Sequence, residues 1–162
     1  MPTRTLALLV ALLFCNVGIA QKEQTQKLTT GPVDKMEKTA PGKIDATADS
    51  KFKTTESGLK YRILRKSDKA KPKATDTVTV HYKGWLDNKK IFDSSYRRNE
   101  KISFPLTGVI KGWTEGLQLI GKGGMIELEI PAKLGYGARG VGNGLIPANS
   151  TLHFLVELSE IK

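Results

Sequence analysis

Six aromatic residues and one carboxylate are the side chains of this sequence best suited to chemistry. The aromatics are spread along residues 82–154, so they can meet only in a shared core or in a pocket that opens from it. Asp93 directly follows Phe92, and a carboxylate beside an aromatic needs a hydrogen-bond partner, which the hydroxyl of Tyr82 could supply. Alternatively, the aromatics only fill a hydrophobic core. Asp93 could likewise serve only in a turn or cap with Ser94. The six aromatics are Tyr82, Phe92, Phe104, Trp113, Tyr136 and Phe154.

Residues for other kinds of catalysis form no known motif. His81 and His153 fall on the polar faces of two predicted strands, which is typical of surface histidines. The sequence has no phosphate-binding loop, no metal-ligand cluster and no nucleophile with an adjacent base. Its only cysteine, Cys15, lies within the first twenty residues. We therefore expect no metal and no cofactor, and the sequence offers no catalytic residues for hydrolysis or phosphoryl transfer.

The elements that must position the aromatics follow from hydrophobic periodicity. Four segments alternate apolar and polar residues, which predicts an antiparallel sheet with one packed face and one wet face. One short helix is predicted over 112–120, where Trp113 shares a face with Leu117 and Ile120. One helix against one antiparallel sheet is an α+β fold. The four alternating segments are 59–63, 77–82, 125–130 and 152–159.

Residues 1–20 have the three-part pattern of a secretory signal peptide. Arg4 gives a positive start, residues 6–14 form an apolar run, and Gly18 and Ala20 place small residues at a cleavage site. The run is too short to span a bilayer core of ~30 Å comfortably. We therefore expect export to the periplasm or the exterior, cleavage after about Ala20, and no stable membrane insertion.

Residues 21–55 are poor in large apolar side chains and rich in Lys, Thr, Asp and Ala. Such a segment buries too little surface to offset the entropy lost on ordering, so it is predicted to be a flexible tether before one folded domain over 56–162. The chain carries a formal charge of +10, and residues 58–162 hold eighteen Lys and Arg against ten Asp and Glu. The basic residues are scattered without interleaved aromatics, so we expect no nucleic-acid partner.

Seven strings of residues follow one another from about residue 57 to the C-terminus, over roughly two-thirds of the chain. They are HYKG (81–84), FDSS (92–95), FPL (104–106), VIKGWTEGL (109–117), PAKLGYG (131–137), IP (146–147) and TLHFLVEL (151–158). In content and spacing they resemble the FKBP family of peptidyl-prolyl cis/trans isomerases. The resemblance implies an FKBP-like fold, an antiparallel sheet of about five strands curved around one short α-helix. It also implies catalysed rotation of X–Pro bonds during the folding of exported proteins.

The same resemblance assigns residues to a proline pocket. Trp113 would form the floor beneath the pyrrolidine ring, Tyr82, Phe92 and Phe154 the walls, and Val109 a further part of the lining.

Polar groups of the pocket are assigned in the same way. The backbone N–H of Ile110 and the hydroxyl of Tyr136 would hold ligand carbonyls. Asp93 would lie at the rim, steadied by Tyr82, and would orient the substrate electrostatically instead of acting as a general acid.

Two features depart from the family pattern. Ile102 stands where many members have a further aromatic pocket residue, and we expect it to alter affinity for macrolide inhibitors of the FK506 and rapamycin type. The loop over 139–144 is longer than in the smallest members and rich in glycine, so its contacts with substrate are not assigned.

Other functions remain open on the sequence alone. The domain could bind proline-containing segments as a chaperone or binding module without turnover, or its basic surface could give it a structural or adhesive role. The expected partners are proline-containing peptides and unfolded or partly folded exported proteins. Because residues 21–55 are shorter than the helical leaders through which some family members dimerise, we expect a monomer. Asn149 begins a glycosylation acceptor triplet, whose meaning depends on the host.

Overall fold

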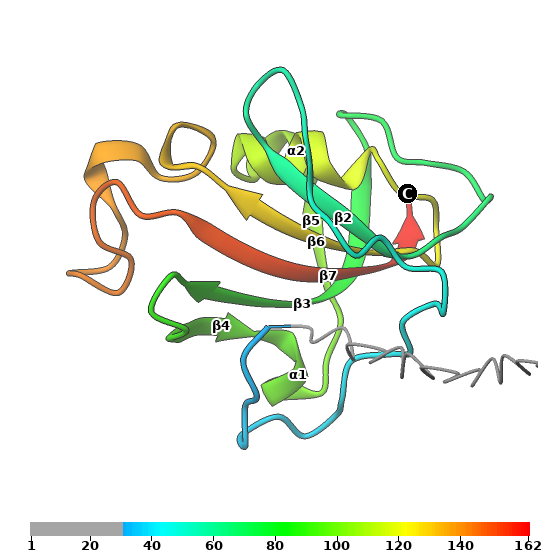
Figure 1. Ribbon diagram of the computed structural model, residues 1–162, viewed down its shortest axis with the longest axis horizontal. Helices are drawn as coiled ribbons and strands as arrows, with labels where there is room; N and C mark the ends of the chain where they lie inside the picture. The colour runs from blue at the N-terminus through cyan, green and yellow to red at the C-terminus, as the bar shows by residue number, and fades with distance from the viewer. Residues whose placement is uncertain (1–30) are drawn as a thin grey trace, which may run out of the picture.

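Seven antiparallel strands form one sheet in the computed structural model, which describes residues 31–162 (Figure 1). The strand order is β1-β2-β6-β7-β3-β4, and β5 pairs with β3 beyond that path. The expected signal peptide and the first ten residues of the expected tether lie outside the described residues. The strands are β1 Lys53–Thr54, β2 Lys60–Arg65, β3 Thr77–Leu86, β4 Ile91–Ser94, β5 Ile102–Pro105, β6 Met125–Ile130 and β7 Leu152–Ile161.

The α+β class and the antiparallel sheet expected from periodicity are confirmed. The four alternating segments became β2, β3, β6 and β7, while β1, β4 and β5 are too short to show a period. The expected helix is α2, Lys111–Leu117, and it is joined by a one-turn helix α1, Ser95–Arg98. Three single turns of 3-10 helix at Leu106–Gly108, Ala132–Leu134 and Gly137–Arg139 complete the elements. No helix among residues 31–162 is long and apolar enough to cross a bilayer.

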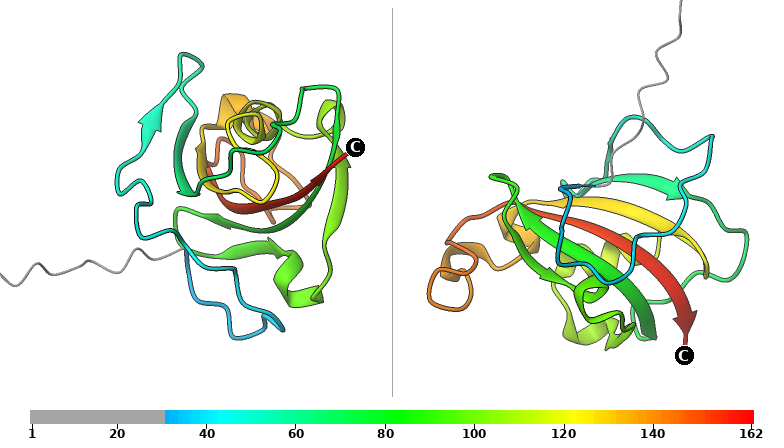
Figure 2. Two further views of the ribbon diagram at one scale, coloured as in Figure 1. Left: turned by 90° about the vertical axis from the view of Figure 1, so that its right-hand side faces the viewer. Right: turned by 90° about the horizontal axis from the view of Figure 1, so that it is seen from below.

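The sheet curves around α2, and the main core fills the space between them (Figure 2). Two glycines of α2 face the sheet at the helix spacing of four residues. A Cβ on Gly112 would lie 2.5 Å from Ile130 Cγ2, and one on Gly116 would lie 2.8 Å from Leu128 Cδ2. The helix therefore sits closer to β6 than any larger residue would permit, and its Trp113 is buried above the middle of the sheet.

The opposite face of the sheet is not simply wet, contrary to the expectation from alternation. Leu64, Trp85, Met125 and Leu155 form a second buried cluster there, with Ile44 packed against it. This cluster is covered because the chain before β1 runs along the outer face.

Polar anchors hold that covering segment, residues 31–52. The carboxylate of Glu37 lies 3.2 Å from Lys83 Nζ, and both side chains are buried. The N–H of Gly42 donates to Glu157 at 2.8 Å. A Cβ on Gly31, whose φ is +67°, would lie 2.6 Å from the Trp85 ring, so the chain crosses that ring closely.

This packing differs from the expected flexible tether over 21–55. The expectation considered only apolar burial, whereas ion pairs and hydrogen bonds to distant residues place the segment. Composition alone does not reveal partners of that kind.

Adding a methyl group at Gly112 is expected to lower the free energy of unfolding by about 1–2 kcal/mol. Overpacking a dense core costs ~1–3 kcal/mol, and the better helix propensity of Ala returns at most ~1 kcal/mol. Urea unfolding of Gly112→Ala measures the change. Gly108→Ala is the matched control, because the nearest atom to its added Cβ is Pro105 Cγ at 3.4 Å. Equal stability of the two variants would refute the close approach of α2.

Candidate functional site

A pocket of about 600 Å³ opens between the sheet, α2 and the loop that precedes β7. Its lining is mostly aromatic and aliphatic, and its oxygen-bearing side chains are one carboxylate and two phenol hydroxyls. The lining residues are Tyr82, Phe92, Asp93, Phe104, Gly108, Val109, Ile110, Trp113, Tyr136, Val141, Leu145, Ile146 and Phe154.

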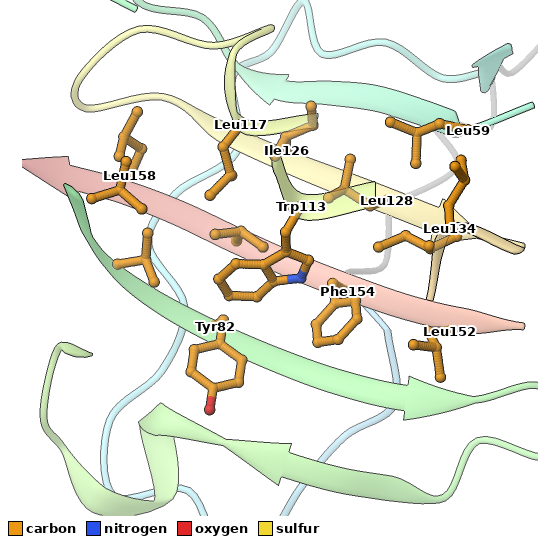
Figure 3. Close-up of a cluster of buried hydrophobic side chains, with 14 of the residues drawn as sticks. Leu59, Tyr82, Trp113, Leu117, Ile126, Leu128, Leu134, Leu152, Phe154 and Leu158 are labelled. Atoms are coloured by element: carbon orange, nitrogen blue, oxygen red, sulfur yellow. The ribbon is translucent and has the colours of Figure 1, made fainter. Parts of the chain in front are cut away.

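The indole of Trp113 is the centre of the aromatic cluster. Its ring centroid lies 5.3 Å from Tyr82, 5.6 Å from Phe104 and 5.3 Å from Phe154, with interplanar angles of 82–85° in each case. Edge-to-face contacts of this kind add stability beyond the area that they bury. Figure 3 shows Trp113 between Tyr82 and Phe154, above the strands that carry them. The floor of the pocket is thus held from three sides.

Gly84 on β3 lets the rings of Phe92 and Phe154 meet. A Cβ at this position would lie 2.6 Å from Phe92 Cε2 and 2.7 Å from Phe154 Cε1. The two rings are themselves in edge-to-face contact, with centroids 5.5 Å apart. Because Gly84 pairs with both Asp93 on β4 and Phe154 on β7, its lack of a side chain makes room for one wall of the pocket.

Asp93 lies at the rim with two hydrogen-bond donors on it. The hydroxyl of Tyr82 donates to Asp93 Oδ2, as expected from the sequence. Arg98 Nη1 donates to Asp93 Oδ1 at 2.7 Å, and Arg98 Nη2 donates to the Tyr82 hydroxyl at 3.3 Å. The three side chains form a closed triangle, which fixes the direction of the carboxylate.

These contacts set the protonation of the rim. Burial alone would raise the pKa of Asp93, but the hydrogen bonds from Arg98 and Tyr82 and the charge of Arg98 lower it overall. Burial, and then the hydrogen bond to Asp93, raise the pKa of Tyr82. At neutral pH the rim therefore carries an ionised Asp93 and a protonated Tyr82.

Two donors at the mouth of the pocket make no hydrogen bond to another described residue. Ile110 precedes α2 in an extended conformation, so its N–H is not used by the helix. The hydroxyl of Tyr136 is the second, and this residue is 40% exposed. Burial and the nearby charge of Asp93 raise the pKa of Tyr136, which keeps its O–H proton in place.

The loop over 139–144, left unassigned from the sequence, turns back over the pocket. Val141 and Ile146 pair across it through two backbone hydrogen bonds of 2.8 and 3.1 Å. Val141 and Leu145 line the pocket, yet each keeps at least a third of its surface exposed. The loop therefore presents apolar surface beside the aromatic part of the pocket around Trp113, which we call the aromatic well.

The structure brings together eight of the nine residues that the family resemblance assigned, and it leaves Ile102 out. Ile102 pairs with Val80 on β3 and packs against the core outside the lining. Phe104, two residues further along β5, supplies the aromatic ring instead, because its longer side chain reaches Tyr82 and Trp113.

Sequence reasoning missed Arg98, Val141 and Leu145. A basic residue five positions after Asp93 is a weak hint of a salt bridge, and nothing in the glycine-rich loop marked its apolar residues. Within residues 31–162, no group of three or more His, Asp, Glu or Cys side chains is placed to bind a metal.

Comparison with known proteins agrees with this geometry. A family model described as FKBP-type peptidyl-prolyl cis-trans isomerase matches residues 68–159. The FKBP-type peptidyl-prolyl cis-trans isomerase FkpA of Escherichia coli is 53% identical over 110 residues, which are 68% of this chain and 40% of FkpA. A probable FKBP-type isomerase of Haemophilus influenzae is 53% identical over 109 residues, which are 67% of this chain and 45% of that protein.

Solved structures show the same fold. The crystal structure of E. coli FkpA has a TM-score of 0.67 at 51% identity, and the match covers 70% of this chain and 53% of that one. A peptidyl-prolyl cis-trans isomerase from Pseudomonas syringae has a TM-score of 0.65 at 35% identity, over 70% of this chain and 83% of that one. The chain spans less than half the length of the two curated relatives named above. Its family model covers more than half of its residues, and the chain belongs to the FKBP-type peptidyl-prolyl cis-trans isomerase family.

Proposed function

We propose that residues 56–162 form a peptidyl-prolyl cis/trans isomerase domain that accelerates rotation of X–Pro bonds in exported proteins. The observation that carries the proposal is the aromatic well around Trp113, with hydrogen-bond donors and an ionised carboxylate at its mouth. The family supports the same activity.

The reaction asks little of the catalyst. An X–Pro bond rotates against a barrier of ~18–20 kcal/mol because resonance gives the amide partial double-bond character. No covalent bond breaks, so neither a nucleophile nor a proton transfer is needed. A catalyst has only to bind the twisted amide better than the planar forms, and each tenfold gain in rate needs ~1.4 kcal/mol.

The well supplies that preference in two ways. It holds the pyrrolidine ring against Trp113, between Tyr82, Phe104 and Phe154, which anchors one end of the rotating bond. It also removes water, and a planar amide is more dipolar than a twisted one, so the dry site favours the twisted geometry.

The groups at the mouth hold the other end of the bond. The N–H of Ile110 and the hydroxyl of Tyr136 donate to substrate carbonyls, and fixed donors cost no reorganisation during the reaction. The ionised Asp93 gives the rim a local negative charge without taking part in proton transfer. Val141 and Leu145 contact apolar side chains next to the proline.

The cellular setting is part of the same proposal. Residues 1–20 direct export and are removed after about Ala20, so the domain acts in the periplasm or outside the cell as a monomer. Its clients are proline-containing segments of unfolded or partly folded exported proteins. Macrolides of the FK506 and rapamycin type compete for the same well.

The proposal is tested by following cis/trans exchange of a Leu-Pro peptide by NMR with the purified protein and with Trp113→Leu. We expect the protein to accelerate exchange and the variant to lose about tenfold or more in kcat/KM, which corresponds to at least ~1.4 kcal/mol of transition-state binding. Tyr61→Leu is the control, since it removes an aromatic ring of β2 that is not part of the pocket lining. Binding of the peptide without acceleration by folded protein would favour a binding module or chaperone.

The activity is expected to be independent of pH between about pH 5 and pH 9, inside the ordinary Asp and Tyr pKa values of ~3.9 and ~10. The pKa of Asp93 is lowered in the folded protein, so the stability that its ionised form contributes is present above the unfolded pKa. That stability is lost as the pH falls through the folded pKa. The raised pKa of Tyr136 keeps its donor intact at the alkaline end. A step in kcat/KM between pH 5 and pH 8 that Asp93→Asn removes would contradict this.

A further inference from the structure

One side of the pocket rim depends on a very short helix. Asp93 ends the part of β4 that lines the pocket, and Arg98, which donates to its carboxylate, is the last residue of α1. The direction of the Asp93 carboxylate is therefore set by the conformation of the intervening residues 94–97.

Helix α1 has little stability of its own. It has four residues, its N-cap Ser94 makes no side-chain capping bond, and no acidic residue stands in its first turn. An isolated single turn is unfavourable because nucleation fixes several residues for one hydrogen bond. Contacts from elsewhere must hold it. Some of these contacts come from the sheet: Ser95 Oγ accepts from the N–H of Tyr82 at 2.8 Å, and the Tyr96 hydroxyl donates to Glu157 at 2.7 Å.

Residues 34–38 of the covering segment supply further contacts. Arg97 Nε donates to Asp34 Oδ2 at 2.6 Å, and the side chain of Asp34 is only 5% exposed. The N–H of Lys38 donates to the carbonyl of Tyr96 at 3.1 Å. The hydroxyl of Ser94 donates to Glu37 Oε1 at 3.1 Å. Three residues of the β4–α1 connection, Ser94, Tyr96 and Arg97, are thus bound by three residues of the covering segment.

Glu37 also ties this arrangement to β3. Its carboxylate pairs with Lys83 Nζ, and both side chains are at least nine-tenths buried. Lys83 follows Tyr82, the residue that donates to Asp93 from the other side. Glu37 therefore joins the two strands whose side chains form the rim triangle.

We propose that Asp34 and Glu37 are positioning residues of the pocket rim, and that the covering segment fixes Arg98 against Asp93 by holding α1. The segment touches the outer face of the sheet, so it acts on the pocket through α1 and β3 and not by contact with substrate. The effect on turnover rests on the proposed isomerase function, whereas the effect on Asp93 does not.

The test removes the Asp34 side chain in the full chain and titrates Asp93 by carboxyl ¹³C NMR. In Asp34→Ala we expect the pKa of Asp93 to rise toward its ordinary value, because Arg98 is no longer held beside it. We also expect kcat/KM for the Leu-Pro peptide to fall about threefold to tenfold, in the range of coupling seen between contacting residues. Asp34→Ala is preferred to a change at Glu37, which would leave Lys83 buried without a counter-charge.

Two further variants separate positioning from general destabilisation. Asp49→Ala breaks an ion pair of the same segment with Lys53, far from α1, and should change neither the Asp93 titration nor kcat/KM. Arg97→Ala should reproduce the effects of Asp34→Ala, and the double variant should show no further loss. An unchanged Asp93 titration in folded Asp34→Ala would overturn the proposal, and so would an equal shift in Asp49→Ala. If the protein has no isomerase activity, the titration still decides the positioning role.

Discussion

The close approach of α2 to β6 is the constraint on which the pocket depends. Gly112 and Gly116 bring the helix backbone against Ile130 and Leu128, and Trp113 projects from that helix into the concave side of the sheet. A larger residue at either glycine would lift the helix and with it the floor of the well. The aromatic contacts of Trp113 are thus a consequence of how tightly two backbones can pack.

Strand β3 joins the two faces of the sheet. Tyr82 and Gly84 point to the pocket side, and Lys83 and Trp85 point to the outer side, as the period of two in a strand requires. These four consecutive residues therefore build part of the pocket wall and anchor the covering segment. A change on one face of β3 has a direct structural route to the other.

The sequence predicted most of the fold and most of the site. Long alternating segments identified the four main strands, and ordered motifs identified eight lining residues. Short strands such as β1 and β5 were not predicted, because two to four residues are too few to show an alternation of apolar and polar side chains. The predicted site included Ile102 and omitted Phe104, whereas the pocket is lined by Phe104 and not by Ile102. Alignment to a motif does not tell how far a side chain reaches. The covering segment was missed because Glu37 and Lys83 are paired across forty-six positions.

Trp113 has one further property that follows from its place in the well. Its indole Nε1 is buried and has no hydrogen-bond partner among residues 31–162, and Figure 3 shows this nitrogen on the side of the ring that faces Phe154. The chain has only two Trp residues, and the other is sealed beneath the outer layer of the domain. Indole emission responds to local polarity, so a ligand that enters the pocket changes the fluorescence of Trp113. The fluorescence of Trp85 stays unchanged, because this ring lies on the other face of the sheet. The protein thus carries its own optical reporter of pocket occupancy.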